Sequence, residues 1–295
     1  MIGSPLHWAY FKLVVTAALW GGTFIAGRVV AQVMGPFTAA FCRFAIASVA
    51  LLLLIYRIEG GLPCLSVRQA WQVVLLGMTG IFAYNVFFFS GLQTVTAGRA
   101  ALIIALNPVA IALGSALVYR DPLSGGKRLG IGLSLTGAAV VISGGNPTDL
   151  LRGGLSPGDG FLLGCVFSWM SYTLLGKAVM GQLSALAATT YGCLAGTVLL
   201  LVPALAEGLI QTLPTAGIAA WAGLGFLGLL GSAVGFSWYY EGLKAIGPAR
   251  AGVFINLVPA FAILLAALLL QEPVPLTLLG GGSLIVAGVI LTNRT

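Results

Sequence analysis

The sequence predicts an all-α membrane protein in which ten transmembrane helices form two inverted five-helix repeats around a central cavity. Three observations predict this fold. Of the 295 residues, 59% are hydrophobic and 7% are charged, whereas soluble domains carry roughly 25% charged residues. Ten apolar runs are each long enough to cross a hydrocarbon core about 30 Å thick. Residues of the first half of the chain also recur in the second half with a nearly constant spacing along the sequence.

The ten expected spans follow one another through short connections, such as "RIEGGLP", whose residues are typical of turns. The spans lie near residues 11–31, 37–56, 70–92, 99–119, 127–144, 157–177, 185–205, 216–240, 250–270 and 276–292. The first run could belong to a signal peptide, but nine further spans follow and no convincing small-residue cleavage pattern flanks it. We therefore expect it to remain as a helix.

The positions of the basic residues predict how the chain is oriented, because short cytoplasmic loops are enriched in Lys and Arg. With ten spans, both termini lie on one side of the membrane. That side collects ten of the fourteen basic residues, which are Lys12, Arg57, Arg68, Arg120, Lys127, Arg128, Lys177, Lys244, Arg250 and Arg294. The other side collects three, Arg28, Arg99 and Arg152. We therefore expect both termini in the cytoplasm.

The internal repeat divides the chain into residues 1–146 and 147–295. Equivalent positions differ by 149 near the start of each half and by 151 further on. The equivalent pairs include Trp20 and Trp169, Arg99 and Arg250, Pro108 and Pro259, and Asp121 and Glu272. Five spans are an odd number, so the second half enters the membrane in the opposite sense. Inverted repeats of this kind are typical of secondary transporters, in which two halves surround a site at the middle of the membrane.

Several stretches resemble the EamA-type branch of the drug/metabolite transporter superfamily. They are "LWGGTFIAGR" at 19–28, "LIIALNPVAIAL" at 102–113, "YRDPL" at 119–123 and "GIGLSLTGAAVVISG" at 130–144, together with their echoes in the second half. Within that branch, the chain is most similar to bacterial exporters of aromatic and other neutral amino acids. The resemblance implies a carrier in the bacterial inner membrane that exports amino acids or related small metabolites by alternating access.

A proline lies in the middle of the fourth and ninth spans, Pro108 and Pro259, and an asparagine stands near each, Asn107 and Asn256. Proline removes a backbone hydrogen bond, which lipid tolerates only where a cavity or a neighbouring helix satisfies the freed carbonyl. We expect both spans to bend at the cavity and to help gate it. The alternative is that the prolines only shape helix packing.

Arg43 lies about seven residues inside the second span. A charge at this depth indicates function by default, so Arg43 either faces the cavity and pairs with a substrate carboxylate or extends to the nearer surface. The other expected substrate-binding residues are Trp20, Thr23, Tyr84, Asn85, Asn107, Trp169, Tyr172, Trp238, Tyr239 and Asn256. Tryptophan and tyrosine in mid-membrane need hydrogen-bond partners, which favours an inward orientation. For each single residue, the alternative is packing between helices.

Three acidic residues at span ends have expected structural roles. Asp121 and Glu272 each precede a proline, which predicts that each acid caps the helix that follows it. Glu241, at the end of the eighth span, is expected to lie in water.

The sequence argues against an enzyme. His7 is the single histidine and the four cysteines, Cys42, Cys64, Cys165 and Cys193, are dispersed, so no histidine-based catalytic group or metal centre is expected. A phosphate-binding loop is also missing, which argues against ATP-driven pumping. We expect no cofactor.

The expected partners are a small-molecule substrate and the lipid bilayer. The net charge of +7 is scattered over separate loops, which argues against nucleic-acid binding. We expect a monomer. Two alternatives stay open: a proton-coupled exporter of lipophilic cationic drugs, which the lack of an acid near any span centre disfavours, and a membrane scaffold without transport.

Overall fold

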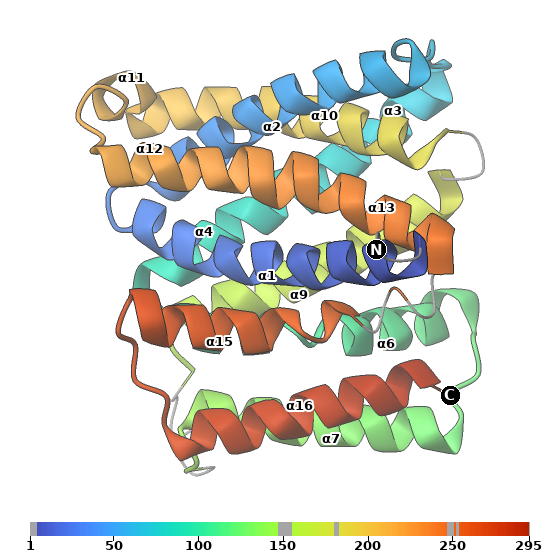
Figure 1. The fold of residues 1–295 in the computed structure, drawn as a ribbon, viewed down its shortest axis with the longest axis vertical. Coiled ribbons are helices and arrows are strands. Elements are labelled where there is room, and N and C mark those ends of the chain that lie inside the picture. Colours follow the sequence, from blue (N-terminus) through green and yellow to red (C-terminus); the bar gives the residue numbers. More distant parts are fainter. Residues whose placement is uncertain (1–4, 147–154, 180–182, 247–250, 252–253, 295) are drawn as a thin grey trace.

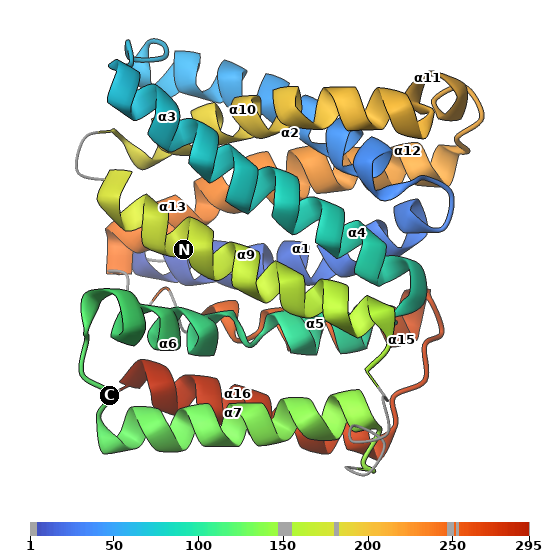
Figure 2. The ribbon, with the colours of Figure 1, turned by 180° about the vertical axis from the view of Figure 1, so that it is seen from behind.

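The computed structural model describes residues 5–146, 155–179, 183–246, 251 and 254–294. The helices lie side by side and run in alternating directions between two faces of the molecule (Figures 1 and 2). Helix α1 begins and α16 ends at the same face, which we call the termini face (Figure 1). The opposite face is called the far face.

The regular elements of the described chain are all helical. Those before residue 147 are α1 (Pro5–Ala31), α2 (Pro36–Glu59), α3 (Val67–Leu76), η1 (Gly77–Ala83), α4 (Tyr84–Thr94), α5 (Ala97–Ile104), α6 (Asn107–Tyr119) and α7 (Gly125–Ser143). Those after it are α9 (Pro157–Val179), α10 (Ala185–Glu207), α11 (Leu209–Thr212), α12 (Ile218–Gly225), η2 (Phe226–Val234), α13 (Gly235–Ile246), α15 (Val258–Leu269) and α16 (Leu276–Arg294).

Seven helical stretches of the described chain are long and apolar enough to cross a membrane. They are Leu6–Ala31, Pro36–Glu59, Val67–Thr94, Ala97–Tyr119, Leu186–Glu207, Ile218–Tyr239 and Leu276–Asn293. The expected all-helical membrane protein is thus confirmed, whereas the count of ten spans stays a prediction. Helices α7, α9 and α15 overlap the three other expected spans, but the start of the ninth span and the expected boundary at 146/147 lie partly outside the described residues.

The fourth and ninth expected spans are broken rather than merely bent. Helix α5 ends at Ile104 and α6 begins at Asn107, which puts Pro108 in the first turn of a new helix. A second interruption at residues 256–257 precedes α15, where Pro259 occupies the same place. Proline is well tolerated in a first turn because its missing N–H would have no partner there in any case.

The structure contradicts the expected capping roles of Asp121 and Glu272. The N-cap residue of α7 is Ser124, whose hydroxyl accepts a hydrogen bond from the Lys127 N–H at 3.2 Å. The Glu272 carboxylate accepts instead from the first residues of α5, 175 positions earlier in the chain. Each acid lies four residues before the helix that follows it, whereas a capping side chain belongs directly before the first turn. The sequence-based prediction was therefore wrong.

Two π-helical segments, η1 and η2, were not predicted. They begin 149 positions apart, at Gly77 and Phe226. A backbone carbonyl in each accepts a hydrogen bond from a neighbouring helix: the Ser168 hydroxyl donates to the Thr79 oxygen at 2.6 Å, and the Trp20 indole N–H donates to the Gly231 oxygen at 3.0 Å. Such segments are frequent at functional sites.

Close helix packing fixes the framework around these segments. Helix α16 lies along α7, α10 along α2 and α9 along α4. A Cβ on Gly137 of α7 would lie 2.5 Å from the Gly281 oxygen of α16, so the two backbones leave no room for a side chain there. Arg99 of α5 forms a partly buried ion pair with Asp159 of α9 at 2.6 Å. These contacts tie the N-terminal and C-terminal parts of the chain together.

Candidate functional site

The Arg43 side chain points into the helix bundle rather than to the membrane surface. Its Nη1 donates a hydrogen bond at 3.0 Å to the amide oxygen of Asn85, which is 1% exposed. The Asn85 amide nitrogen is held in turn by the Ile81 carbonyl at 2.9 Å, one turn earlier in the same helix. This second bond fixes which end of the amide faces the guanidinium.

The guanidinium of Arg43 retains unused donors. Its Nε is buried and has no acceptor within the described part of the chain. The ion pairs that the structure shows there are Lys12 with Glu241 and Arg99 with Asp159, so Arg43 is not neutralised by a described carboxylate. A buried charge without a counter-ion is costly, and a ligand anion would offset that cost.

Aromatic rings surround this guanidinium and continue away from it. The guanidinium carbon of Arg43 lies 5.8 Å from the ring centroid of Phe88 in α4. Phe88 stacks on Tyr84 at 6.1 Å, and Tyr84 packs against Trp169 of α9 at 5.5 Å. Trp169 lies 5.1 Å from Tyr172. We call Tyr84, Phe88, Trp169 and Tyr172 the α4/α9 aromatic cluster; it packs beside the polar pair Arg43 and Asn85.

A second aromatic group joins α1 to α13. The Trp20 ring lies 5.2 Å from Tyr239 and 5.7 Å from Phe236. The Thr23 hydroxyl donates to the Trp20 carbonyl at 2.6 Å, within α1. Trp20, Thr23 and Tyr239 thus form a second assembly of the expected binding residues.

Trp238 lies apart from the other expected site residues. Its ring centroid is 5.8 Å from Lys12 Nζ, and Lys12 also pairs with the half-exposed Glu241. Glu241 is therefore exposed as expected, but it has an ion-pair partner.

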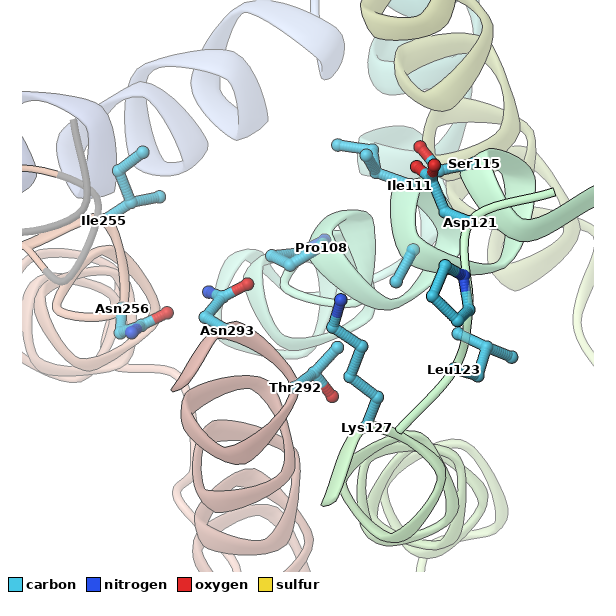
Figure 3. Close-up of a pocket in the computed structure, with 12 residues that line it drawn as sticks. Pro108, Ile111, Ser115, Asp121, Leu123, Lys127, Ile255, Asn256, Thr292 and Asn293 are labelled. Carbon is cyan, nitrogen blue, oxygen red and sulfur yellow. The ribbon is translucent and has the colours of Figure 1, made fainter. Parts of the chain in front are cut away.

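A pocket of about 630 Å³ opens between α6, α7, α16 and the segment that precedes α15 (Figure 3). Pro108 and Asn256, which flank the two helix breaks, line its inner part, and Asp121 and Lys127 line it near the loop between α6 and α7. The amide oxygen of Asn107 is buried and has no hydrogen-bond partner in the described structure. Pro259 is buried within α15.

Five of the expected binding residues thus come together, namely Arg43, Tyr84, Asn85, Trp169 and Tyr172. The sequence analysis missed Phe88 and Phe236, because phenylalanines are numerous in the expected spans and nothing in their local pattern sets these two apart. The described residues contain no group of three or more His, Cys, Asp or Glu side chains that could hold a metal ion.

The sequence profile of the EamA-like transporter family matches this chain twice, over residues 7–143 and again over residues 156–294. The chain belongs to the EamA-like transporter family. The two matches cover most of the chain and place the helix breaks, the π-helical segments and both aromatic groups inside family segments.

Relatives of this EamA-like protein are transporters by name. The chain is 27% identical to an uncharacterized transporter, YyaM, of Bacillus subtilis over 96% of its length and 93% of that protein. It is 32% identical to a probable terminal-alkyne amino-acid exporter of Streptantibioticus cattleyicolor over 97% of its length and 93% of that protein. One solved crystal structure, 20% identical in sequence, superposes with a TM-score of 0.66 over 96% of each chain and shows the same fold.

Proposed function

We propose that this EamA-like protein is a secondary transporter that exports neutral and aromatic amino acids and related small metabolites across the bacterial inner membrane by alternating access. In this proposal, ten helices form two inverted five-helix repeats, 1–146 and 147–295, with both termini in the cytoplasm. The protein needs no cofactor and works as a monomer. The helix breaks at Pro108 and Pro259 allow the two helices to change their angle, so that the substrate path opens at one face or the other.

The observation that carries the proposal is the partly buried guanidinium of Arg43, whose buried Nε has no described acceptor and which has no described counter-ion. An arginine fork matches the geometry of a carboxylate. The adjoining α4/α9 aromatic cluster suits an apolar side chain of the same ligand. A ligand with one carboxylate and an apolar or aromatic group therefore fits this site best.

The charge of Arg43 also bears on the alternative cargo. A lipophilic cation would meet a like charge at this site, which disfavours its binding. The probable terminal-alkyne amino-acid exporter of Streptantibioticus cattleyicolor, which is 32% identical to this chain, also favours an amino acid over a lipophilic cation as the cargo.

Flux into proteoliposomes tests the proposal. The panel compares phenylalanine, alanine, phenylalanine amide and a lipophilic cation, with and without a proton gradient, for the wild-type protein and for Arg43→Ala and Arg43→Lys. We expect saturable flux of phenylalanine and alanine and little flux of the amide, which keeps the ring and the amine but lacks the carboxylate. Arg43→Ala removes a charge-assisted contact of about 1.5–3 kcal/mol and should lower flux at low substrate roughly 10- to 100-fold.

The thermal melting temperature of each variant shows whether it is folded. Arg43→Lys keeps the charge but loses the bidentate geometry, so it should fall between the wild type and Arg43→Ala. Equal flux of phenylalanine and its amide would refute carboxylate recognition. Cation flux driven by a proton gradient would establish the drug exporter instead, and no saturable flux of any compound would favour a scaffold.

A further inference from the structure

At the far face, one carboxylate connects the loop after α15 to the start of α5. Glu272, in the loop after α15, accepts the Ala97 N–H at 2.9 Å through Oε1 and the Gly98 N–H at 3.2 Å through Oε2. These N–H groups belong to the first turn of α5, whose own N-cap residue, Thr96, makes no side-chain capping bond. A helix start has unsatisfied N–H donors and favours negative charge. The loop after α15 therefore completes the start of α5.

A pocket lies at the termini face of the same helices. Asp121 stands 151 positions before Glu272 and follows α6 as Glu272 follows α15. Its side chain is exposed and borders the pocket of Figure 3, and the positions equivalent to Ala97 and Gly98, 248 and 249, lie outside the described part of the chain. The broken helices are thus fastened by a carboxylate at the far face and parted by a pocket at the termini face.

The pair α2 and α10, whose members pack against each other, provides an internal reference, because carboxylates fasten it at both faces. At the far face, Glu207 at the end of α10 accepts the Phe37 and Thr38 N–H groups of α2 at 3.3 and 2.6 Å. At the termini face, Glu59 at the end of α2 accepts from the hydroxyl of Ser184, the N-cap residue of α10, at 2.8 Å. Carboxylates thus hold this pair together at both faces.

We propose that Glu272 is the latch of the far face: its hold on the start of α5 keeps the transport path closed there, and its release opens it. This inference rests on the proposed transport function. It assigns a positioning role to a residue outside the substrate site. The structure then corresponds to a state that is closed at the far face and accessible from the termini face.

Two cysteine reporters test the latch in a background with Cys64→Ser, because Cys64 is exposed whereas the other three cysteines are buried. Ile263→Cys reports on the far face, since the Ile263 side chain lies 3.3 Å from the place of a Cβ on Gly98, directly behind the latch. Ala112→Cys reports on the pocket at the termini face. In lipid nanodiscs a polar maleimide reaches both faces, so each labelling rate reports on its own face.

The test variant is Glu272→Gln, which keeps the size of the side chain but offers one acceptor oxygen to two N–H donors. Loss of a charge-assisted bond shifts a two-state equilibrium by about tenfold or more. We expect labelling of the Ile263→Cys reporter to become about tenfold faster, and labelling of the Ala112→Cys reporter to become slower. Opposite changes at the two faces are the signature of a gate.

The matched control is Glu207→Gln, which removes the same kind of contact from the start of α2. It should lower the melting temperature and leave both labelling rates within about twofold. A folded Glu272→Gln variant with unchanged labelling of the Ile263→Cys reporter would overturn the latch, as would equal acceleration of both reporters, which indicates general loosening. Labelling needs no substrate. A wrong cargo would therefore abolish the expected amino-acid flux without affecting this result.

Discussion

The two halves that match the family profile share a framework but not a polar site. Each half contains a π-helical segment and a helix broken before a proline. Each half also contains a tryptophan that contacts the other half: Trp20 at η2 and Trp169 at Tyr84, directly after η1. The first half also contributes Arg43 and Asn85. A shift of 149 to 151 residues places Gly192, Cys193 and Leu194 at the position of Arg43, and Val234, Gly235 and Phe236 at that of Asn85. None of these residues carries a charge or an amide side chain.

This difference separates the conformational change of the protein from the recognition of its substrate. The proposed alternating access needs two similar halves that exchange conformations, so the framework features occur twice. A single small cargo needs one carboxylate contact, so the arginine occurs once. The site is therefore expected where the repeat is least regular, and three variants test that view.

The largest expected effect comes from Asn85→Asp. The new carboxylate would lie where the amide oxygen now accepts from Arg43 at 3.0 Å, and it would form an internal ion pair. This pair competes with the substrate carboxylate for a contact of about 1.5–3 kcal/mol, so flux at low phenylalanine should fall roughly 10- to 100-fold in a folded protein. Asn85→Ala leaves Arg43 free to bind the substrate carboxylate, so it should reduce phenylalanine flux much less than Asn85→Asp. Near wild-type flux for Asn85→Asp would remove Arg43 from the substrate site.

Tyr172→Thr should have an intermediate effect, since it gives the second half the residue that the first half has at the equivalent Thr23. The change removes a ring 5.1 Å from Trp169. Aromatic pairs contribute about 0.5–1.5 kcal/mol, so phenylalanine flux should fall roughly 2- to 10-fold relative to alanine flux. The control is Thr23→Ser, which keeps the hydroxyl. Equal losses for both substrates would mean that Tyr172 serves packing alone.

The smallest expected effect comes from Cys193→Ser at the position equivalent to Arg43. Cys193 is buried, and a serine hydroxyl in a helix can bond to a carbonyl one turn earlier. Phenylalanine flux in proteoliposomes should stay within about twofold of wild type. A loss as large as that of Arg43→Ala would show that both halves contact the cargo.

The sequence by itself determined the class of fold, the positions of most helices and the two places where a span departs from a straight helix, although it predicted bends there rather than breaks. These features depend on local properties: apolar runs long enough for the membrane, and prolines that cannot continue a helix. The constant spacing of Pro108 and Pro259 even placed the breaks at matching points. The family followed from the same motifs.

Only the tertiary structure decided which side chains meet. Trp238 and Tyr239 are neighbours in sequence, yet Tyr239 packs on Trp20 and Trp238 lies beside Lys12, because successive residues point about 100° apart around a helix. The contact of Arg43 with Asn85 depends on how α2 and α4 are rotated against each other. Glu272 looked like a local cap, but its partners lie 175 and 174 residues earlier in the chain. Helix rotation and contacts between distant segments arise from packing of the whole bundle, and a local sequence pattern does not encode them.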